Sequence, residues 1–526
     1  MAEIVSLKNK NFLILTIIFI FLEILIINSR GVWAPDEARY ARVAYEMKER
    51  QSYLIPFLNG ELYREKPPLF FDFAILFSIF KEGLPHYSVK LVSLFGAITV
   101  LILSTFLAVK LGLKNCYLVA LILIGMPKFL WQSQFGQIDM LLCSFVLSQI
   151  LVGIYVIESA KKISFWYLLL LAFFSFLAIL SKGPAGVLPV YISLILITIF
   201  VKKQKKILNL IISILMTLIF TTFWLYLAGI YVGFDYSKSL VLKQTVTRYL
   251  DPWHHYAPFY YYFLVIFADG FPFIFMFIPA LIESYKRKLL KEKQFLYPLT
   301  ILFVYIIFFS ISSGKRSVYI LPVYPMVAIF LSFAIEKWLT LDFPKKRLTI
   351  FTSVTFVFPF FAIIYLYKRV TPFYSFDILV LVFGFLFYLL GIFLFLYYLL
   401  KKKEFYPQLF TICTIILVLT SLPALHTLDE IKTPYDFVSS IKPFTKCGIE
   451  LGVYPDLVPS VNYYLEKNTK VFKEKEEEKA YSFLSDGNLL LIKEKTIPKI
   501  LQENSFVISK GQIGNEKFLL LVSRKD

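Results

Sequence analysis

Long apolar runs, each followed by a short polar segment, dominate the chain from its start to about residue 425. A helix needs roughly 20 apolar residues to cross the ~30 Å hydrocarbon layer of a bilayer, with a practical minimum near 17. By this measure the pattern predicts thirteen transmembrane helices. They are expected at about 12–28, 89–109, 116–134, 139–157, 164–180, 186–201, 207–231, 259–281, 295–312, 318–336, 348–368, 376–400 and 408–423.

One further run, Leu69–Phe80, is too short to be a fourteenth span. Its twelve residues would reach only about 18 Å as a helix, and Asp72 lies inside it, so we interpret it as interfacial. With a cytoplasmic N-terminus, this choice places the basic clusters on the cytoplasmic side, as the positive-inside rule requires. These clusters lie at 110–114, 161–162, 202–206, 286–293, 345–347 and 401–403.

The same topology defines what faces outward. The outer segments are 29–88, 135–138, 181–185, 232–258, 313–317 and the part after His426. In that last part, apolar and polar stretches alternate, and Asn488–Ile492 and Lys517–Val522 are expected to be strands. The predicted fold is therefore a polytopic α-helical membrane domain over 1–425, with a long outer loop at 29–88. A small periplasmic α/β domain follows over 426–526.

Composition supports this class. The chain is 58% hydrophobic and 17% charged with a mean hydropathy of +0.69, which excludes an ordinary soluble enzyme and a disordered chain. The net charge of +19 belongs to the membrane part, chiefly to its cytoplasmic loops, since 426–526 carries equal numbers of acids and bases. Short basic clusters between apolar runs exclude a nucleic-acid partner. Four scattered cysteines exclude a disulfide framework or a cysteine metal site.

The outer loop 29–88 carries the first candidate chemistry. In Ala34-Pro35-Asp36-Glu37-Ala38-Arg39-Tyr40, the proline and two acids suit the first turn of a helix, so a well-capped surface helix would explain them alone. About 25 residues later, Tyr63-Arg64-Glu65-Lys66-Pro67-Pro68 precedes the interfacial run. The two prolines hold Glu65 and Lys66 in a stiff, extended entry at the membrane surface.

Other outer segments add further charged groups. They are Asp139 at the start of the fourth span, Ser181-Lys182-Gly183-Pro184, Ser313-Gly314-Lys315-Arg316-Ser317-Val318-Tyr319, and a loop with His254 and His255. Each could be an interfacial anchor. Together they bring acids, cations and histidines from several spans to one membrane face. That pattern is expected of a site that binds an anionic lipid headgroup and performs acid–base or metal-assisted chemistry.

These motifs resemble the GT-C glycosyltransferases, and most closely the lipid A aminoarabinose transferase and its protein O-mannosyltransferase relatives. The resemblance covers roughly residues 1–330, and its most specific strings are Glu65-Lys66-Pro67-Pro68 and Lys315-Arg316-Ser317-Val318-Tyr319-Ile320-Leu321-Pro322. It implies that a sugar moves from a polyprenyl-phosphate carrier, of undecaprenyl type, to an acceptor at the outer face. No nucleotide is expected as a cofactor, because nucleotide sugars are absent outside the cytoplasm.

The resemblance also implies roles for individual residues. Asp36 and Asp139 are expected at the sugar and the acceptor, with the adjacent Glu37 as a third candidate catalytic carboxylate. Arg39, Lys66, Lys182, Lys315 and Arg316 are expected to hold the donor phosphate. Tyr40, Tyr63 and Tyr319 are expected to line the substrate, and Glu65 with His254 or His255 to bind a divalent ion such as Zn²⁺, Mg²⁺ or Mn²⁺.

The expected function is transfer of a lipid-carried sugar to a lipid acceptor, lipid A first among them, by a monomer in the bacterial inner membrane with its site facing the periplasm. A related transferase with a protein or polysaccharide acceptor is the main alternative. A transporter of lipid-linked sugars is a further one, because Glu23 and Asp269 are acids inside predicted spans. However, these two acids are too few and too far apart to form a proton or ion relay. The other charged motifs gather at one membrane face, whereas a transporter should have its main polar groups near the midplane.

Overall fold

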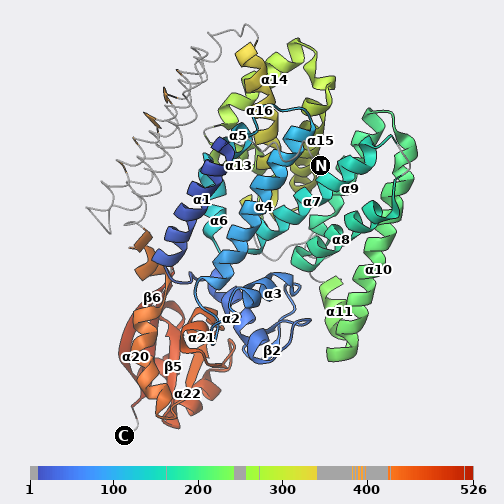
Figure 1. The fold of residues 1–526 in the computed structure, drawn as a ribbon. Helices are drawn as coiled ribbons and strands as arrows, with labels where there is room; N and C mark the ends of the chain where they lie inside the picture. The colour runs from blue at the N-terminus through green and yellow to red at the C-terminus, as the bar shows by residue number, and fades with distance from the viewer. Residues whose placement is uncertain are drawn as a thin grey trace. The chain divides into compact units, whose positions relative to one another are not determined.

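The computed structural model describes residues 10–160, 163–241, 256–271, 273–340, isolated positions between 382 and 397, and 425–524 except 427 and 515 (Figure 1). Its contacts divide the chain into two compact units. Unit 1 consists of Met1–Ile26, Arg64–Phe70 and Val92–Pro423, and unit 2 of Ile27–Tyr63, Phe71–Leu91 and Ala424–Asp526. The boundaries fall inside three helices, which contribute residues to both units: α1 (Lys10–Ser29), α3 (Leu69–Leu76) and α4 (Ser88–Lys110).

The described part of unit 1 is helical. Its elements are α1 (Lys10–Ser29), α4 (Ser88–Lys110), α5 (Tyr117–Ile124), α6 (Pro127–Gln134), α7 (Ile138–Glu158), α8 (Phe165–Lys182), η2 (Pro184–Gly186), α9 (Leu188–Phe200), η3 (Gln204–Lys206), α10 (Ile207–Val232), α11 (Phe234–Val241), α13 (Tyr261–Asp269), α14 (Ile274–Lys286), η5 (Leu289–Lys291), α15 (Lys293–Ile311), η6 (Ser317–Ile320) and α16 (Val323–Thr340). Helices α7, α8 and α10 pack in succession, and α15 packs against both α9 and α16 (Figure 1).

Each of the first ten predicted spans coincides with a helix or a pair of helices. Among the described residues, six helices are long and apolar enough to cross a membrane, and α13 with α14 would make a seventh span bent by 108°. The last three predicted spans fall almost wholly outside the described residues, so the count of thirteen stays a prediction. The run Leu69–Phe80 contains only the eight-residue helix α3 (Leu69–Leu76), about 12 Å long and too short to cross, as predicted.

One predicted span, 116–134, is broken. Helix α5 ends at Gly125, and α6 begins at Pro127 with Met126 held extended between them. A proline fits the first turn of a helix but restricts the residue before it, which explains the break at Met126. The turn before α5 is held by a residue from far along the chain: the N–H groups of Lys114 and Asn115 donate to the Glu336 carboxylate at 3.1 and 3.2 Å.

Unit 2 combines the outer loop with a C-terminal sheet. Its elements are α2 (Asp36–Glu49), β1 (Phe57–Leu58), β2 (Glu61–Leu62), α20 (Tyr435–Lys446), β3 (Leu451–Tyr454), α21 (Pro459–Leu465), β4 (Lys470–Val471), α22 (Glu477–Ser485), β5 (Leu489–Lys493), η7 (Glu494–Thr496), α23 (Lys499–Glu503), β6 (Ser505–Ile513) and β7 (Glu516–Ser523). The sheet order is β4-β3-β5-β7-β6, with β3 parallel to β4 and β5, and β7 antiparallel to β5 and β6. The two predicted strands of this segment are confirmed as β5 and β7.

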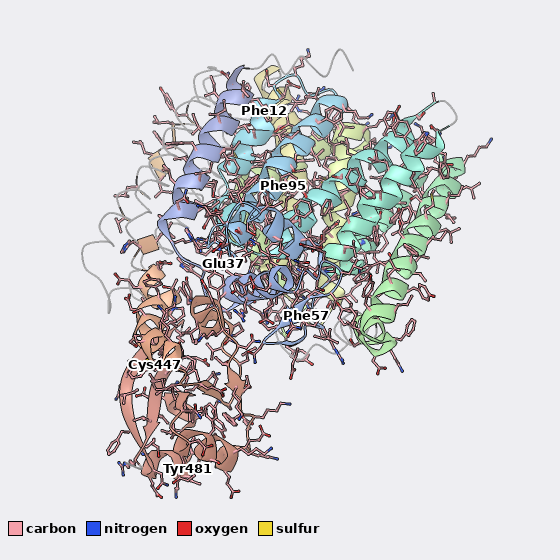
Figure 2. All side chains as sticks on the ribbon, turned by 60° about the horizontal axis from the view of Figure 1, so that its bottom comes forward. Phe12, Glu37, Phe57, Phe95, Cys447 and Tyr481 are labelled. Carbon is pink, nitrogen blue, oxygen red and sulfur yellow. The ribbon has the colours of Figure 1, made fainter. Side chains whose placement is uncertain are left out.

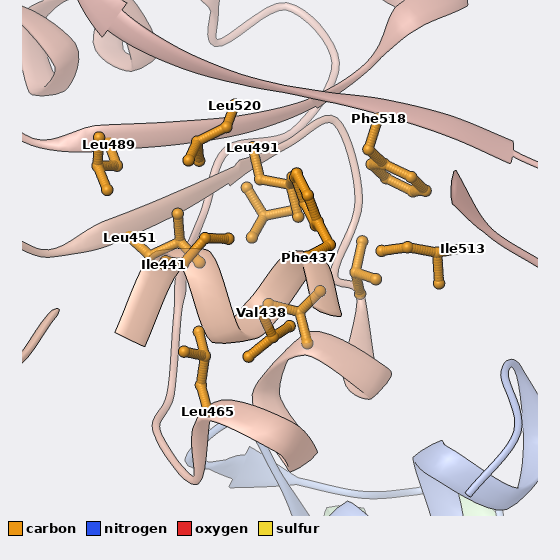
Figure 3. Close-up of a cluster of buried hydrophobic side chains, with 13 residues drawn as sticks. Phe437, Val438, Ile441, Leu451, Leu465, Leu489, Leu491, Ile513, Phe518 and Leu520 are labelled. Atoms are coloured by element: carbon orange, nitrogen blue, oxygen red, sulfur yellow. The ribbon is translucent and has the colours of Figure 1, made fainter. Parts of the chain in front are cut away.

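The sheet is covered on both faces, which its sequence reflects. Strand β5 reads Leu-Leu-Leu-Ile-Lys, a continuous apolar run that is typical of a strand buried on both sides. Leu489 and Leu491 join Phe437, Val438 and Ile441 of α20 in one core (Figure 3). The intervening residues of β5 belong to a second core, with α22 and α23. A small α/β fold therefore forms after residue 434.

Candidate active site

The acid pair of the outer loop begins helix α2, as the sequence predicts, but its two carboxylates have different environments. Glu37, which Figure 2 labels, is fully buried: Arg30 donates from Nη1 to Oε2 at 2.6 Å and from Nη2 to Oε1 at 2.8 Å, and the Trp33 N–H donates to Oε2 at 2.9 Å. Burial raises the pKa of the Glu37 carboxyl, but the Arg30 guanidinium, the Lys90 ammonium and the Trp33 N–H together outweigh this and hold the pKa below its ordinary 4.5. Glu37 is suited to hold the start of α2 in place.

Asp36 is the more accessible of the two acids. Arg39 donates to Asp36 Oδ1 at 2.8 Å, and the two side chains are 27% and 13% exposed, respectively. The Arg39 guanidinium also lies 5.5 Å from the centre of the Tyr40 ring. Both Tyr40 and Tyr63 meet the Phe71 ring edge-on, with ring centres 5.8 and 6.1 Å apart. Unit 2 thus brings Asp36, Arg39 and two of the predicted tyrosines into one neighbourhood.

Residues 30–33, which precede α2, are held by groups that sequence reasoning missed. Lys90 donates to the carbonyls of Ile27 and Arg30 at 3.0 and 2.5 Å. Asp429 accepts from the Gly31 N–H at 2.8 Å and from Trp33 Nε1 at 2.6 Å. Arg30 follows directly after the first apolar run and lies only six residues before Asp36, a signal that could have found it. Asp429 lies about 400 residues away and has no local signal.

In unit 1, the structure pairs Asp139 with Lys182. Asp139 lies in the first turn of α7, Lys182 is the last residue of α8, and the Lys182 ammonium contacts Asp139 Oδ1. The same ammonium lies 4.4 Å from the centre of the Tyr319 ring, on η6. Both charged side chains are largely buried, at 9% exposed for Asp139 and 14% for Lys182. Three predicted site residues from three separate elements therefore meet.

The turn after Lys182 is held by buried polar side chains of the neighbouring helices. Gly183 has a φ of +81°, which only glycine adopts at low cost, and it ends α8. Gln149 of α7 donates to the Gly186 carbonyl at 3.1 Å, and Ser175 donates to Gln149 Oε1 at 3.1 Å. Tyr191 extends this buried chain of polar groups to Ser175 and Ser213. The turn that carries Lys182 is thus held by hydrogen bonds within the helical bundle.

The other predicted cations occupy separate positions. Lys315 is 5% exposed, and its ammonium donates to the carbonyls of Ala257, at 3.0 Å, and Ser312. An open cavity of about 530 Å³ lies beside it, with Tyr256, Phe259 and Ile311 among its lining residues. Arg316 is half-buried, and its carbonyl accepts from the Tyr262 hydroxyl at 3.3 Å. An aromatic rim around a cation suits the level of lipid headgroups.

The predicted metal ligands are not brought together in the described residues. Glu65 and Lys66 are half-buried in the segment before α3, whereas His254 and His255 lie outside the residues that the structure describes. Within the described ranges, no three His, Cys, Asp or Glu side chains gather in a manner that could hold a metal ion. The metal site stays a prediction.

One acid that sequence reasoning considered for a transporter has an ion-pair partner. The Lys128 ammonium lies 3.3 Å from Asp269 Oδ2 and donates to the Ser317 hydroxyl at 2.8 Å. Lys128, on α6, was not foreseen as a partner because 140 residues separate it from Asp269. The pair joins α6 and α13 to η6, which accounts for Asp269 without an ion pathway.

The sequence is similar to that of several known membrane proteins. Residues 10–237 match the dolichyl-phosphate-mannose-protein mannosyltransferase family. The chain is 27% identical over 330 residues to an uncharacterized protein of Aquifex aeolicus, covering 61% of this chain and 63% of that protein. It is 26% identical over 338 residues to the undecaprenyl phosphate-alpha-4-amino-4-deoxy-L-arabinose arabinosyl transferase of Serratia proteamaculans, covering 62% and 59%. The chain therefore spans about three fifths of the length of these relatives.

The structural match extends over nearly the whole chain. The crystal structure of ArnT from Cupriavidus metallidurans bound to undecaprenyl phosphate superposes with a TM-score of 0.80 at 15% identity, covering 98% of both chains. The archaeal oligosaccharyltransferase AglB from Archaeoglobus fulgidus gives a TM-score of 0.50 at 10% identity, over 93% of this chain and 70% of that one. The chain has the fold of these GT-C membrane proteins, and the predicted resemblance is confirmed. It is a multi-pass membrane protein.

Proposed function

We propose that this protein is a glycosyltransferase that moves a sugar from a polyprenyl phosphate of undecaprenyl type to a lipid acceptor, lipid A first among them. The observation that carries the proposal is that Asp36 and Asp139 each lie in the first turn of a helix with one cation beside them, Arg39 or Lys182, whereas Glu37 is completely buried against Arg30. The ArnT structure with undecaprenyl phosphate has the same fold, and the Serratia relative is named as an arabinosyl transferase for a sugar carried on undecaprenyl phosphate.

The chemistry required of these residues is modest. The bond between the anomeric carbon and the phosphate oxygen breaks, a bond from the acceptor oxygen to that carbon forms, and polyprenyl phosphate leaves as an anion. Cations stabilise the charge that develops on it, and Arg39, Lys66, Lys182, Lys315 and Arg316 are the candidates. A hydroxyl acceptor would lose its proton to a carboxylate, for which Asp36 is our candidate. An acceptor that is already an ionised phosphate needs no base, and Asp36 would then orient the reactants.

Lys182 is related both to the cation that the leaving phosphate requires and to the carboxylates near the sugar and the acceptor. In the described structure its ammonium neutralises Asp139 and faces Tyr319. A donor phosphate at this place would compete for the same ammonium, so Lys182 would both orient Asp139 and receive the leaving group. The proposed location is the bacterial inner membrane, with the site at the periplasmic face, where a lipid-carried donor replaces a nucleotide sugar.

A transfer assay with the full-length protein tests the proposal. Purified protein receives radiolabelled polyprenyl-phosphate sugar and a total membrane extract, and the label is followed into lipid and protein fractions. Wild-type protein is expected to label a lipid, and Asp36→Asn and Asp139→Asn to lose about 10²–10⁴-fold in turnover. Glu82→Gln, an exposed carboxylate of the same outer loop, is the matched control and should keep full turnover.

The outcomes separate the candidate functions. Label in the protein or polysaccharide fraction would replace the lipid acceptor by the alternative one. Label that stays on the carrier with wild-type protein, for every donor sugar supplied, would contradict transferase activity. Elemental analysis before and after chelation, set against turnover, tests whether a divalent ion binds at Glu65 and the histidines.

A further inference from the structure

The turn of the β1–β2 hairpin is bound by hydrogen bonds on both its backbone and its side chain. Asn59 and Gly60 form the turn, with φ values of +55° and +84°. Asparagine and glycine suit this left-handed conformation. The Glu46 carboxylate of α2 accepts from both turn amides, from Asn59 at 2.7 Å and from Gly60 at 2.8 Å. The hairpin is therefore tied to the last part of α2.

The side chain of Asn59 makes the second set of bonds, to the C-terminal segment. Its Nδ2 donates to the Thr469 carbonyl at 3.0 Å, and its Oδ1 accepts from Asn462 Nδ2 at 2.7 Å and from the Thr469 N–H at 3.0 Å. Thr469 also donates from its hydroxyl to Asn462 Oδ1 at 3.1 Å. Asn59 is thus hydrogen-bonded directly to residues that lie more than 400 positions later in the chain.

Arg42 closes the network from α2. It donates to Glu46 at 2.9 Å, to the Asn462 carbonyl at 3.1 Å and to Asn468 Oδ1 at 2.6 Å. Arg42 and Glu46 are only 3% and 4% exposed, so water does not solvate their charges. Buried charges need hydrogen-bond partners within the protein, and this network supplies them. Helix α2 also packs along α21, the helix that carries Asn462.

A second attachment lies at the other end of α2. Asp429 and Tyr464, both in the C-terminal segment, bind the backbone of Gly31 and Val32, and Asp429 also binds the Trp33 indole. The C-terminal segment therefore contacts the outer loop both before α2 and after it. Between these attachments lie Asp36 and Arg39, and directly after the hairpin come Tyr63, Glu65 and Lys66.

We propose that the C-terminal domain positions the outer loop for catalysis, with Asn59, Asn462 and Asn468 as positioning residues that contact no substrate. A domain added after the membrane part could instead bind the acceptor. The network favours positioning, because its polar groups are consumed in bonds to the loop. Small displacements of reacting groups cost large factors in rate, so loss of this network should lower turnover. The kinetic part of this inference rests on the proposed function; the structural part does not.

The variant Asn59→Gly tests the inference with little risk to folding. Glycine adopts the left-handed turn, and the bonds from Glu46 to the turn amides remain, so only the side-chain bonds to the C-terminal segment are lost. Gln51→Gly is the matched control: Gln51 also has a positive φ of +52° in the same outer loop, and its side chain is exposed. Asn468→Ala, at an exposed position, removes one bond from the opposite side.

Hydrogen–deuterium exchange of the full-length protein in detergent gives the readout that does not depend on activity. We expect exchange over residues 53–63 to rise at least about tenfold in Asn59→Gly and less in Asn468→Ala, with Gln51→Gly like wild type. Protection equal to wild type in Asn59→Gly would overturn the inference, whatever the assay of transfer shows.

Kinetics give the second readout. We expect Asn59→Gly to lower kcat about tenfold or more while the KM for the acceptor changes less than about twofold. A raised acceptor KM with unchanged kcat would mean that the domain binds the acceptor and would overturn positioning. If wild-type protein itself transfers no sugar, the proposed function fails, and the exchange result still decides whether the C-terminal domain holds the loop.

Discussion

Two helices of this protein each have a candidate catalytic carboxylate in their first turn, and the chain holds the two helices in place by different means. Helix α2, outside the membrane part, is charged along its length, and its buried Arg30–Glu37 and Arg42–Glu46 pairs have a hydrogen-bond partner for nearly every polar atom. Helix α7 is apolar, and its start is held by close packing: a Cβ on Gly96 would lie 2.8 Å from the Met140 carbonyl carbon.

The difference follows from the surroundings of the two regions, which are water for the part that contains α2 and lipid for the helical bundle that contains α7. Next to water, a surface helix needs specific charge pairs to reach one orientation, and each buried charge needs a partner. Among lipid chains, apolar side chains gain nothing by leaving lipid, so helices associate through small residues and a few hydrogen bonds. Polar pairing therefore fixes helix α2, and small-residue packing fixes the backbone at the start of α7, whose Asp139 is in addition paired with Lys182. The following variants test this contrast.

Removing the cation from the buried pair of unit 2 should have the largest effect. Arg30→Ala leaves the Glu37 carboxylate buried without its partner, which typically costs about 3–5 kcal/mol. The measurement is the thermal stability of the detergent-solubilised protein by loss of its monodisperse fraction. Lys479→Ala, which breaks an exposed pair with Glu476, is the control and should leave stability unchanged. The double variant Arg30→Met with Glu37→Met should recover much of the loss, and failure to recover would contradict the pairing argument.

Adding one methyl group at the packed start of α7 should have the next largest effect. Gly96→Ala forces its Cβ against the backbone of Met140 and Leu141, which cannot rotate away, so we expect destabilisation of about 1–3 kcal/mol. Thr99→Ala, on the same helix α4 but less buried, is the control. Stability of Gly96→Ala equal to wild type would show that packing does not fix α7.

Lowering the pH should weaken the buried ion pair of unit 2. The pKa of Glu37 is lowered in the folded state relative to 4.5, so its pairing contributes stability that is present above pH 4.5 and is lost as the pH falls below it. Thermal stability followed from pH 7 to pH 3.5 should therefore decline at the acid end in wild type. The double variant Arg30→Met with Glu37→Met should decline less over that interval; equal declines would assign the acid sensitivity to other groups.

The smallest effect is expected for a hydrogen bond within the helical bundle. Gln149→Leu removes the bond to the Gly186 carbonyl and the acceptor for Ser175, and interhelical bonds of this kind average about 0.6 kcal/mol. Ser193→Ala, whose hydroxyl bonds only within its own helix, is the control. A loss above 3 kcal/mol in Gln149→Leu would mean that polar bonds, and not packing, hold unit 1.

Prediction from the sequence succeeded where one segment decides its own structure. Apolar run length located ten helical regions, and the proline and acids of Pro35-Asp36-Glu37 marked the start of α2. The break at Met126 was missed because apolar length alone does not register Gly125 and Pro127 as an end and a start. Glu37 was grouped with Asp36 because adjacent acids look alike in a sequence, whereas burial separates them in the fold.

The sequence by itself determined the class of the protein, the places of its helices and the outward location of its acids, because these depend on periodicity and composition within short segments. Only the tertiary structure decided which charges pair. Lys182 meets Asp139 because α8 returns beside α7, and Asn59 meets Asn462 because a domain folded from the far end of the chain receives the hairpin. Such pairs depend on distances that close only when separate elements pack, and a linear sequence does not record those distances.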